Sequence, residues 1–474
     1  MTDVDTGLDA AGSASATAEA PGTAPAQGSG SAPAPAQRSG PERGSASAQG
    51  VGVGAAAADR PVSVWRQRNF QALWSAHTVS QFGTQITFFV IPVLSLTTLS
   101  VSTGQLGLIS AMESLPFLLI GLQAGALLDR WDRRRVMVVT DVGRAVALAL
   151  LPIGYFLGLL TVPLLCLVGF VIGLFTVFFD IANQAFLPTV VAREQTPDGN
   201  SRLEFSRSTA ELAGPSLGGL LLQAVAAPLI LVANSLSYLL SALLLGLIRT
   251  PRPEAVQAPG RTRMRTQIAE GLRFVFRHRT LRSLALATGI SNLVGLGGAL
   301  AAVLTAFAIR DLKLSPGQLG LALTVGNCGA LLGATVSGRL IRRAGLGRVL
   351  LVAKSMSGIA VLILATAAPA RAVPTLIAAT GIMACGITVY NIGQVSLRQA
   401  ITPSGMQARM NASVRFAIWG TRPIGAVAGG YLGSVLGTRP TLWLIAGIGL
   451  LSCLPLILTE DVRRLRAFPV LPPE

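Results

Sequence analysis

Long apolar runs separated by short polar connections make up most of the chain after residue 64. Each run is about 20 residues or longer, which is the length a helix needs to cross the hydrocarbon core of a bilayer. Some of the runs are long enough to tilt or to extend past the lipid. The pattern predicts twelve membrane-spanning helices, at residues 70–98, 104–128, 136–158, 162–187, 206–226, 228–248, 282–308, 316–340, 349–369, 373–397, 411–436 and 439–459.

The composition supports an all-α membrane protein as the fold class. Apolar residues make up 51% of the 474 residues, and charged residues only 12%. Because a soluble domain carries about 25% charged residues, the composition argues against a soluble enzyme, a coiled coil or a disordered protein. Residues 1–64 are different: they are rich in Ala, Gly, Ser, Pro and Thr and contain no aromatic residue. We expect this segment to be a disordered tail, since it cannot bury a core.

The positions of the basic residues predict how the chain is oriented. The net charge is +17. Alternate connections, counted from the N-terminal flank, hold 28 Lys and Arg residues, whereas the intervening ones hold four, namely Arg310, Lys313, Arg371 and Arg439. Basic residues accumulate in cytoplasmic connections, so we expect both termini to be cytoplasmic. The basic excess therefore marks one membrane face, and we expect no nucleic-acid partner.

The chain divides into two similar halves. We predict a cytoplasmic tail at 1–64, a six-helix bundle at 65–249, a central cytoplasmic loop at 250–281, a second six-helix bundle at 282–460 and a cytoplasmic tail at 461–474. Gly125 and Gly338 head similar motifs 213 residues apart, and Pro215 and Pro423 head another pair 208 residues apart. Such matches indicate a duplicated six-helix unit, which is a common plan among secondary transporters.

Two motifs carry a family resemblance. Gly125-Ala-Leu-Leu-Asp129-Arg130-Trp131-Asp132-Arg133-Arg134 resembles the loop 2–3 signature of the major facilitator superfamily, with Asp132 where many members have Gly. Ala213-Gly214-Pro215-Ser216-Leu217-Gly218-Gly219 resembles the helix-5 signature of that family, which is associated with antiporters. Other stretches, such as Asp141-Val-Gly-Arg144, are similar to the branch of macrolide-efflux proteins and the enterobactin exporter. The resemblance covers residues 65–460 and implies the major facilitator fold, with two pseudo-symmetric bundles and a substrate cavity between them.

Both motifs also have a physical interpretation. Gly125 lets neighbouring backbones approach, and Asp129 can form a charge-assisted network with the arginines that follow it, which are Arg130, Arg133 and Arg134. Such a network can latch one access state; alternatively, the arginines only determine topology. The second motif, with Gly214, Pro215, Gly218 and Gly219, gives a helix with a smooth face. The resemblance implies a seal or hinge there, and ordinary tight packing is the alternative.

Ionisable residues inside the spans are the strongest functional signal, because each costs roughly 3 kcal/mol near mid-membrane. The acids Glu113, Asp141, Asp180 and Glu211 lie in the first half, whereas residues 312–459 contain no Asp or Glu. A carboxyl that couples transport to protons therefore belongs to the first half. Glu113, near mid-membrane, is our first candidate and Asp180 the second, with His77 as a possible relay. We expect Asp141 to pair with Arg144, and Glu211 with Arg207.

The second half instead carries buried cations: Lys354, Arg415 and Arg422. Arg422 either attracts an anionic group of the substrate or neutralises an acid of the first half, and we favour neutralisation. Polar residues inside the spans are candidates for lining the substrate cavity; they are Asn183, Asn234, Asn292, Asn391 and Gln394.

Several kinds of chemistry have no motif in the chain. We find no Walker A loop, catalytic triad, HExxH or CxxC motif, and only two histidines. We therefore expect neither an enzyme nor a cofactor or metal site, and we expect the four cysteines to be packing residues.

These observations predict a secondary transporter of a bacterial plasma (inner) membrane, a monomer that needs no ATPase subunit. Its predicted function is proton-coupled antiport that exports an amphipathic organic compound, such as a drug, antibiotic or secondary metabolite, by alternating access. Two alternatives remain open. One is an exporter of a dedicated substrate such as a siderophore, lipid or amino acid, and the other is a membrane sensor or scaffold that does not transport.

Overall fold

A computed structural model describes residues 64–128, 131–248, 270, 273–403, 410, 414, 416 and 419–466 of the chain. All regular elements within these residues are helices. The predicted tails and central loop fall mostly outside the described residues, as do three residues singled out above: Asp129, Arg130 and Arg415.

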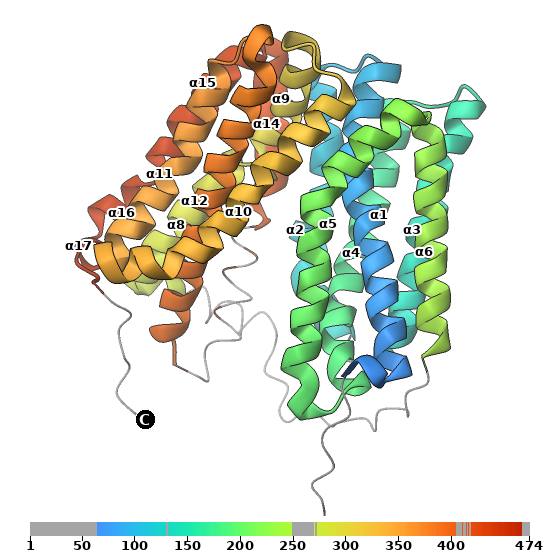
Figure 1. Ribbon diagram of the computed structural model, residues 1–474, viewed down its shortest axis with the longest axis horizontal. Helices are drawn as coiled ribbons and strands as arrows, with labels where there is room; N and C mark the ends of the chain where they lie inside the picture. Colours follow the sequence, from blue (N-terminus) through green and yellow to red (C-terminus); the bar gives the residue numbers. More distant parts are fainter. Residues whose placement is uncertain are drawn as a thin grey trace, which may run out of the picture. The chain divides into compact units, whose positions relative to one another are not determined.

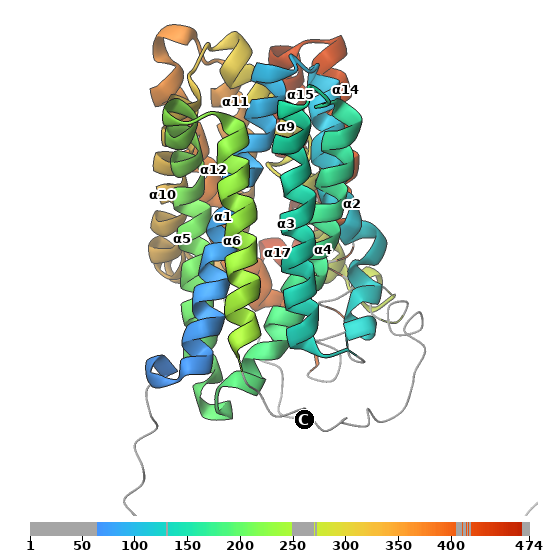
Figure 2. The same cartoon turned by 90° about the vertical axis from the view of Figure 1, so that its right-hand side faces the viewer.

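The first six long helices form one bundle, drawn in blue to green in Figure 1. In Figure 2 the molecule is turned so that this bundle faces the viewer. Within it, α1 contacts α5 and α6, α2 contacts α4, and α3 contacts both α4 and α6. Buried aliphatic and aromatic side chains, among them Phe70, Leu148 and Phe179, fill the space between these helices. The bounds are α1 (Arg68–Thr98), α2 (Thr103–Leu128), α3 (Arg133–Phe156), α4 (Val162–Val190), α5 (Thr196–Ala224) and α6 (Ala227–Leu247).

The remaining helices form a second bundle, drawn in yellow to red. In it, α12 contacts α10 and α11, α15 contacts α11, and α14 contacts α8 and α9. The bounds are α8 (Arg279–Val294), α9 (Ala299–Ala306), α10 (Pro316–Ala344), α11 (Leu346–Ala365), α12 (Ala372–Ala400), α14 (Thr421–Val435), α15 (Thr438–Leu451), α16 (Leu454–Leu458) and α17 (Glu460–Arg463). Short helical turns are η1 (Val64–Arg66), η2 (Arg193–Gln195), η3 (Phe307–Asp311) and η4 (Pro369–Arg371).

Every predicted span coincides with helix in the part of the chain that the structure describes. Ten helical segments there are long and apolar enough to cross a membrane, and the all-α membrane fold is confirmed. The other two expected spans correspond to α5 and α14. These two helices are not among the ten. In α5, five charged side chains lie in the first 16 residues, and α14 is short, with only 15 described residues. The predicted fifth span begins at residue 206, inside α5, which itself begins at Thr196.

Two predicted spans are not single helices. The span at 282–308 is broken between α8 and α9 by a glycine-rich turn, Gly295–Gly298, where Gly298 adopts φ −120° and ψ −128°. The span at 439–459 is interrupted between α15 and α16 at Ser452. Hydropathy alone does not reveal such breaks, since glycine and serine are tolerated inside membrane helices.

The helix ends define two sides of the protein. We call the basic side the one with the start of α3 at Arg133, the end of α10 at Arg343 and the start of α11. The opposite side holds the connections from α1 to α2, from α5 to α6 and from η3 to α10.

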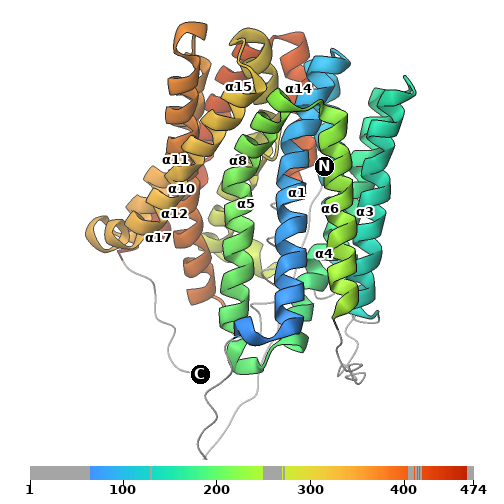
Figure 3. The same ribbon diagram turned by 45° about the vertical axis from the view of Figure 1, so that its right-hand side comes forward.

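Two seams of small residues join the bundles. In the first, α2 crosses α14, and a Cβ atom added to Gly430 would lie only 2.7 Å from the Cα atom of Gly107. In the second, α5 lies against α10, where Gly219 faces Gly317, and the backbone N–H of Ser216 donates to Thr324 Oγ1 at 3.1 Å. Figure 3 shows α5 beside α10. Small residues allow the two backbones to come this close.

Both seams lie on the opposite side of the protein. Among the described residues, the hydrogen bonds, ring contacts and close glycine contacts between bundles lie between that side and about the helix midpoints. The deepest of these on α2 are at Phe117 and Leu118, which contact Trp419 and Gly420. The bundles are therefore closed against each other on the opposite side.

We predict that Gly430→Ala destabilises the protein, because its methyl group would collide with backbone atoms that cannot move aside. Overpacking of this kind costs about 1–3 kcal/mol. The matched control is Gly447→Ala in α15, where an added Cβ meets nothing within 4 Å. In detergent-solubilised protein, the thermal midpoint should fall for Gly430→Ala and stay level or rise for Gly447→Ala. Equal midpoints for the two variants would show that the seam is looser than described.

Candidate functional site

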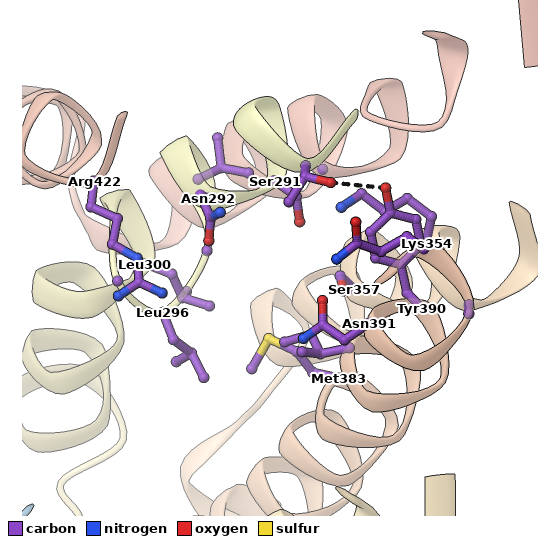
Figure 4. Close-up of a pocket in the computed structure, with 18 of the residues that line it drawn as sticks. Ser291, Asn292, Leu296, Leu300, Lys354, Ser357, Met383, Tyr390, Asn391 and Arg422 are labelled. Atoms are coloured by element: carbon purple, nitrogen blue, oxygen red, sulfur yellow. Dashed lines mark hydrogen bonds between the residues drawn. The ribbon is translucent and has the colours of Figure 1, made fainter. Parts of the chain in front are cut away.

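A cavity with a volume of about 460 Å³ lies in the second bundle. This falls within the roughly 300–1,000 Å³ typical of small-molecule sites. Side chains from α8, α11, α12 and α14 line it, together with the Gly295–Gly298 turn (Figure 4).

One face of α12 supplies the longest wall of the cavity. Its lining residues recur at helical spacing, so their side chains point the same way. They are Met383, Ile387, Tyr390, Asn391, Gln394 and Arg398. Within the described chain, Gln394 Oε1 and Arg398 Nε are buried atoms that make no hydrogen bond. The wall therefore changes along its length from apolar to polar and then to cationic.

Lys354 reaches the cavity from α11, beside Tyr390. Its side chain is only 3% exposed, and its Nζ lies 4.1 Å from the centre of the Tyr390 ring. Thr288 in α8 holds that ring through a hydrogen bond of 2.9 Å between the two hydroxyl oxygens. The ammonium group thus sits on an aromatic face, where the ring's quadrupole attracts it.

The glycine turn between α8 and α9 makes room for Arg422. A Cβ atom added to Gly297 would lie 2.8 Å from Arg422 Nε, so a larger residue there would displace the guanidinium group. Arg422 also stacks on Trp419, at 4.1 Å from the ring centre. The broken helix therefore shapes the end of the cavity where Arg422 lies (Figure 4).

Five of the residues singled out from the sequence meet in this cavity: Asn292, Lys354, Asn391, Gln394 and Arg422. Sequence reasoning missed several other lining residues, namely Ser291, Ser357, Tyr390, Arg398 and Trp419. The missed signal was the i, i+4, i+8 spacing of Tyr390, Gln394 and Arg398. In the sequence, Arg398 is one of the 28 basic residues of the alternate connections.

The other two predicted lining residues lie in the first bundle. Asn234 is 5% exposed; its amide donates to Thr87 of α1 and its Oδ1 accepts from Ser237 at 2.7 Å. Its bonding capacity is used in joining α1 to α6. Asn183 lies beside His77, with 3.2 Å between Asn183 Nδ2 and His77 Nδ1, and both side chains are buried. These asparagines are thus not part of the cavity in the second bundle.

The expected ion pair of Asp141 and Arg144 is present and fully buried in the first bundle. Ser241 donates a hydrogen bond of 2.6 Å to the Asp141 carboxylate. The Arg144 guanidinium lies between two rings, 4.2 Å from the centre of Phe179 and 4.6 Å from that of Tyr238. Each charge therefore has an oppositely charged partner inside the protein, as a low-dielectric interior requires, although Arg144 Nε makes no hydrogen bond in the described chain.

The expected pair of Glu211 and Arg207 is also present, and Arg207 pairs with Glu204 as well. This cluster lies on α5 towards the basic side. Asp180 of α4 is close enough to Arg207 to act on it electrostatically. Arg422 of the second bundle acts in the same way on Glu211.

Glu113 differs from these acids. It is half-buried in α2, and its Cγ would lie 3.1 Å from a Cβ atom added to Gly169 of α4. Gly173 lies against the Glu113 backbone. Within the described residues, no hydrogen bond or ion pair reaches the Glu113 carboxyl. Two glycines thus hold a carboxylic acid without a counter-charge halfway along a membrane helix.

The described arginines of the loop 2–3 motif join helix ends within the first bundle. Arg133 donates to the carbonyl oxygen of Ala185 in α4 at 2.8 Å. Arg134 donates to the carbonyl oxygens of Leu245 and Gly246 at the end of α6. Gly125 lies near the end of α2. In the helix-5 motif, Gly214 and Gly218 pack on α1, whereas Pro215 and Gly219 pack on α10 of the second bundle.

Comparisons with known proteins agree with this architecture. A family model described as a transmembrane secretion effector, of the MFS type, matches residues 60–471. Two helical bundles joined along glycine seams are the architecture of a major facilitator transporter. The chain belongs to the transmembrane secretion effector family within that superfamily.

Relatives of the chain include both uncharacterised and efflux proteins. The chain is 26% identical to the uncharacterised MFS-type transporter YfiS of Bacillus subtilis. The match covers 58% of this chain and 64% of YfiS. The chain is 25% identical over 70% of its length to the multidrug efflux pump Tap of Mycolicibacterium fortuitum, with 82% of that protein matched. Macrolide efflux protein A of Streptococcus pyogenes is 26% identical over 40% of this chain and 46% of its own.

Solved structures share the fold. A bacterial homologue of the iron transporter ferroportin in its inward-facing state superposes with a TM-score of 0.65, at 19% identity, over 82% of this chain and 98% of that one. The TM-score with the outward-facing state of such a homologue is 0.54, at 21% identity, with the same coverage. Both comparisons show the same fold.

We predict that Asp141→Asn strongly destabilises the first bundle, because it leaves the Arg144 charge buried without a partner. Breaking a buried pair from one side costs about 3–5 kcal/mol. The double variant Asp141→Asn, Arg144→Gln should recover part of the loss, as measured by thermal unfolding in detergent. Glu460→Gln is the control, since its pair with Arg464 is exposed. A double variant less stable than Asp141→Asn would contradict this account.

Proposed function

We propose that this transporter exports amphipathic organic compounds in exchange for protons. The observation that carries this proposal is the unpaired carboxyl of Glu113 halfway along α2, within a fold whose relatives include efflux pumps. The cavity of the second bundle suits such a cargo, because apolar residues such as Leu296 and Met383 face it together with amides.

Glu113 is the carboxyl we assign to proton coupling. It is the eleventh residue of α2, about 15 Å from the helix start at 1.5 Å per residue, and so near the middle of a 30 Å hydrocarbon core. Asp141 and Glu211 already have cationic partners, which would resist a change of protonation. Asp180 is the second candidate, and the buried pair of His77 and Asn183 is a candidate relay.

We assign the basic side to the cytoplasm on the distribution of arginines. In that orientation the closed seams face outwards. Export would then proceed by binding cargo in this state, rocking the bundles, and releasing cargo outside while a carboxyl takes up a proton. One proton moving through 100 mV supplies ~2.3 kcal/mol, enough for roughly a fifty-fold gradient of solute.

The test is accumulation of dyes and macrolides in an efflux-deficient bacterial host, with wild type and Glu113→Gln at equal expression. Wild type should lower accumulation. The variant should abolish that effect because it removes the carboxyl, and a protonophore should abolish it because it removes the proton gradient. Glu194→Gln, an exposed acid outside the spans, is the matched control and should export like wild type.

The possible results separate the alternatives. Export that survives Glu113→Gln but not a protonophore moves the coupling role to Asp180, tested by Asp180→Asn. Export that survives the protonophore contradicts proton coupling. No export of any compound on the panel would favour a dedicated substrate, and binding without gradient-dependent flux would favour a sensor.

A further inference from the structure

The two bundles treat their buried cations differently. In the first, Arg144 has Asp141 as its counter-charge. In the second, no carboxylate is within reach of Lys354 among the described residues, and residues 312–459 of the sequence contain no acid. A buried cation without an anion is costly in a membrane. Lys354 is therefore a candidate to meet an anion that enters the cavity.

Lys354 occupies the position in the second half that corresponds to Asp141 in the first. Asp141 is the ninth residue of α3, and Lys354 is the ninth residue of α11, the corresponding helix of the second half. The two positions are 213 residues apart, the same offset that relates Gly125 to Gly338. Each lies near a cation–aromatic contact, with Arg144 on Tyr238 and Lys354 on Tyr390. At this position the first half has an acid, Asp141, and the second half has a base, Lys354, with a cavity beside it.

Further donors face the same cavity. Arg398 lies one helical turn beyond Gln394 on α12, and its buried Nε–H has no acceptor within the described chain. The amide of Gln394 is 5% exposed and has spare bonding capacity at Oε1. Arg422, at the Trp419 end, differs because Glu211 of the first bundle acts on it electrostatically. The cationic groups without an acidic partner in the described chain, Lys354 and Arg398, therefore lie on α11 and near the end of α12.

We propose that the cavity binds the anionic group of an amphipathic organic anion, a carboxylate, sulfonate or phosphate ester, between Lys354 and Arg398. This rests on the proposed export function and names the class of its substrate. The charged group would accept hydrogen bonds from these two side chains, which are stronger than bonds between neutral groups. The apolar body would lie along Met383, Leu296 and Trp419.

The test is equilibrium binding to the purified full chain in phosphatidylcholine nanodiscs, with no gradient. Anilinonaphthalene sulfonate is the anionic probe, and phenylnaphthylamine is a neutral probe with the same aromatic skeleton. Lys354→Met and Arg398→Gln should each weaken binding of the anionic probe about tenfold or more and change binding of the neutral probe less than about twofold. Lys354→Arg should retain binding of the anionic probe.

Arg371→Gln is the matched control, because it removes an exposed positive charge that does not line the cavity. It should leave the binding of both probes unchanged. Equal binding of the anionic probe to wild type, Lys354→Met and Arg398→Gln would overturn the proposal, and so would equal weakening of both probes in these variants and in Lys354→Arg. Because the assay needs no flux, a failure of proton-coupled export would appear separately, as absence of gradient-dependent accumulation with binding intact.

Discussion

The structure depends on one constraint: a charge inside the membrane must be neutralised by something within reach. The first bundle meets it with its own residues, by burying Asp141 and Arg144 together and sandwiching the guanidinium between two rings. On α5, Arg207 joins two carboxylates in the same manner. Glu113 and Lys354 stand apart, one an acid and the other a base, because each lacks an oppositely charged partner in the described chain. A protein tolerates such groups where a mobile ion or ligand completes them.

The two bundles accordingly have different tasks in the mechanism we propose. The unpaired acid belongs to the first bundle, and the unpaired base belongs to the second, where it lines the cavity described above. The proton and the cargo would thus be handled on separate rigid bodies, linked through the seams that both bodies share. Arg422 and Glu211, which act on each other across the bundle boundary, are a direct electrostatic connection between the two.

The sequence was sufficient for the fold class and for much of the charge pairing. Hydropathy located the helices, and the three- and four-residue spacings of Asp141 with Arg144 and of Arg207 with Glu211 identified pairs that the structure confirms. The sequence did not reveal which way each polar side chain points from its helix. Asn234 and Asn391 are both polar residues in apolar helices, yet one ties α1 to α6 and the other lines the cavity. Tertiary packing decides that difference, and it also decides the break after Val294, which a window of average hydropathy smooths over.

The glycine seams have a consequence for how tightly the closed side resists leakage. Across the first seam the nearest atoms are backbone, at Gly107 and Gly430; across the second, the Pro316 backbone lies against Gly219, but the Gln223 side chain lies against Gly317. A contact between backbone atoms has no rotamers to fluctuate and no group to titrate. The part of the closed side formed by Gly107 and Gly430 is therefore insensitive to external pH.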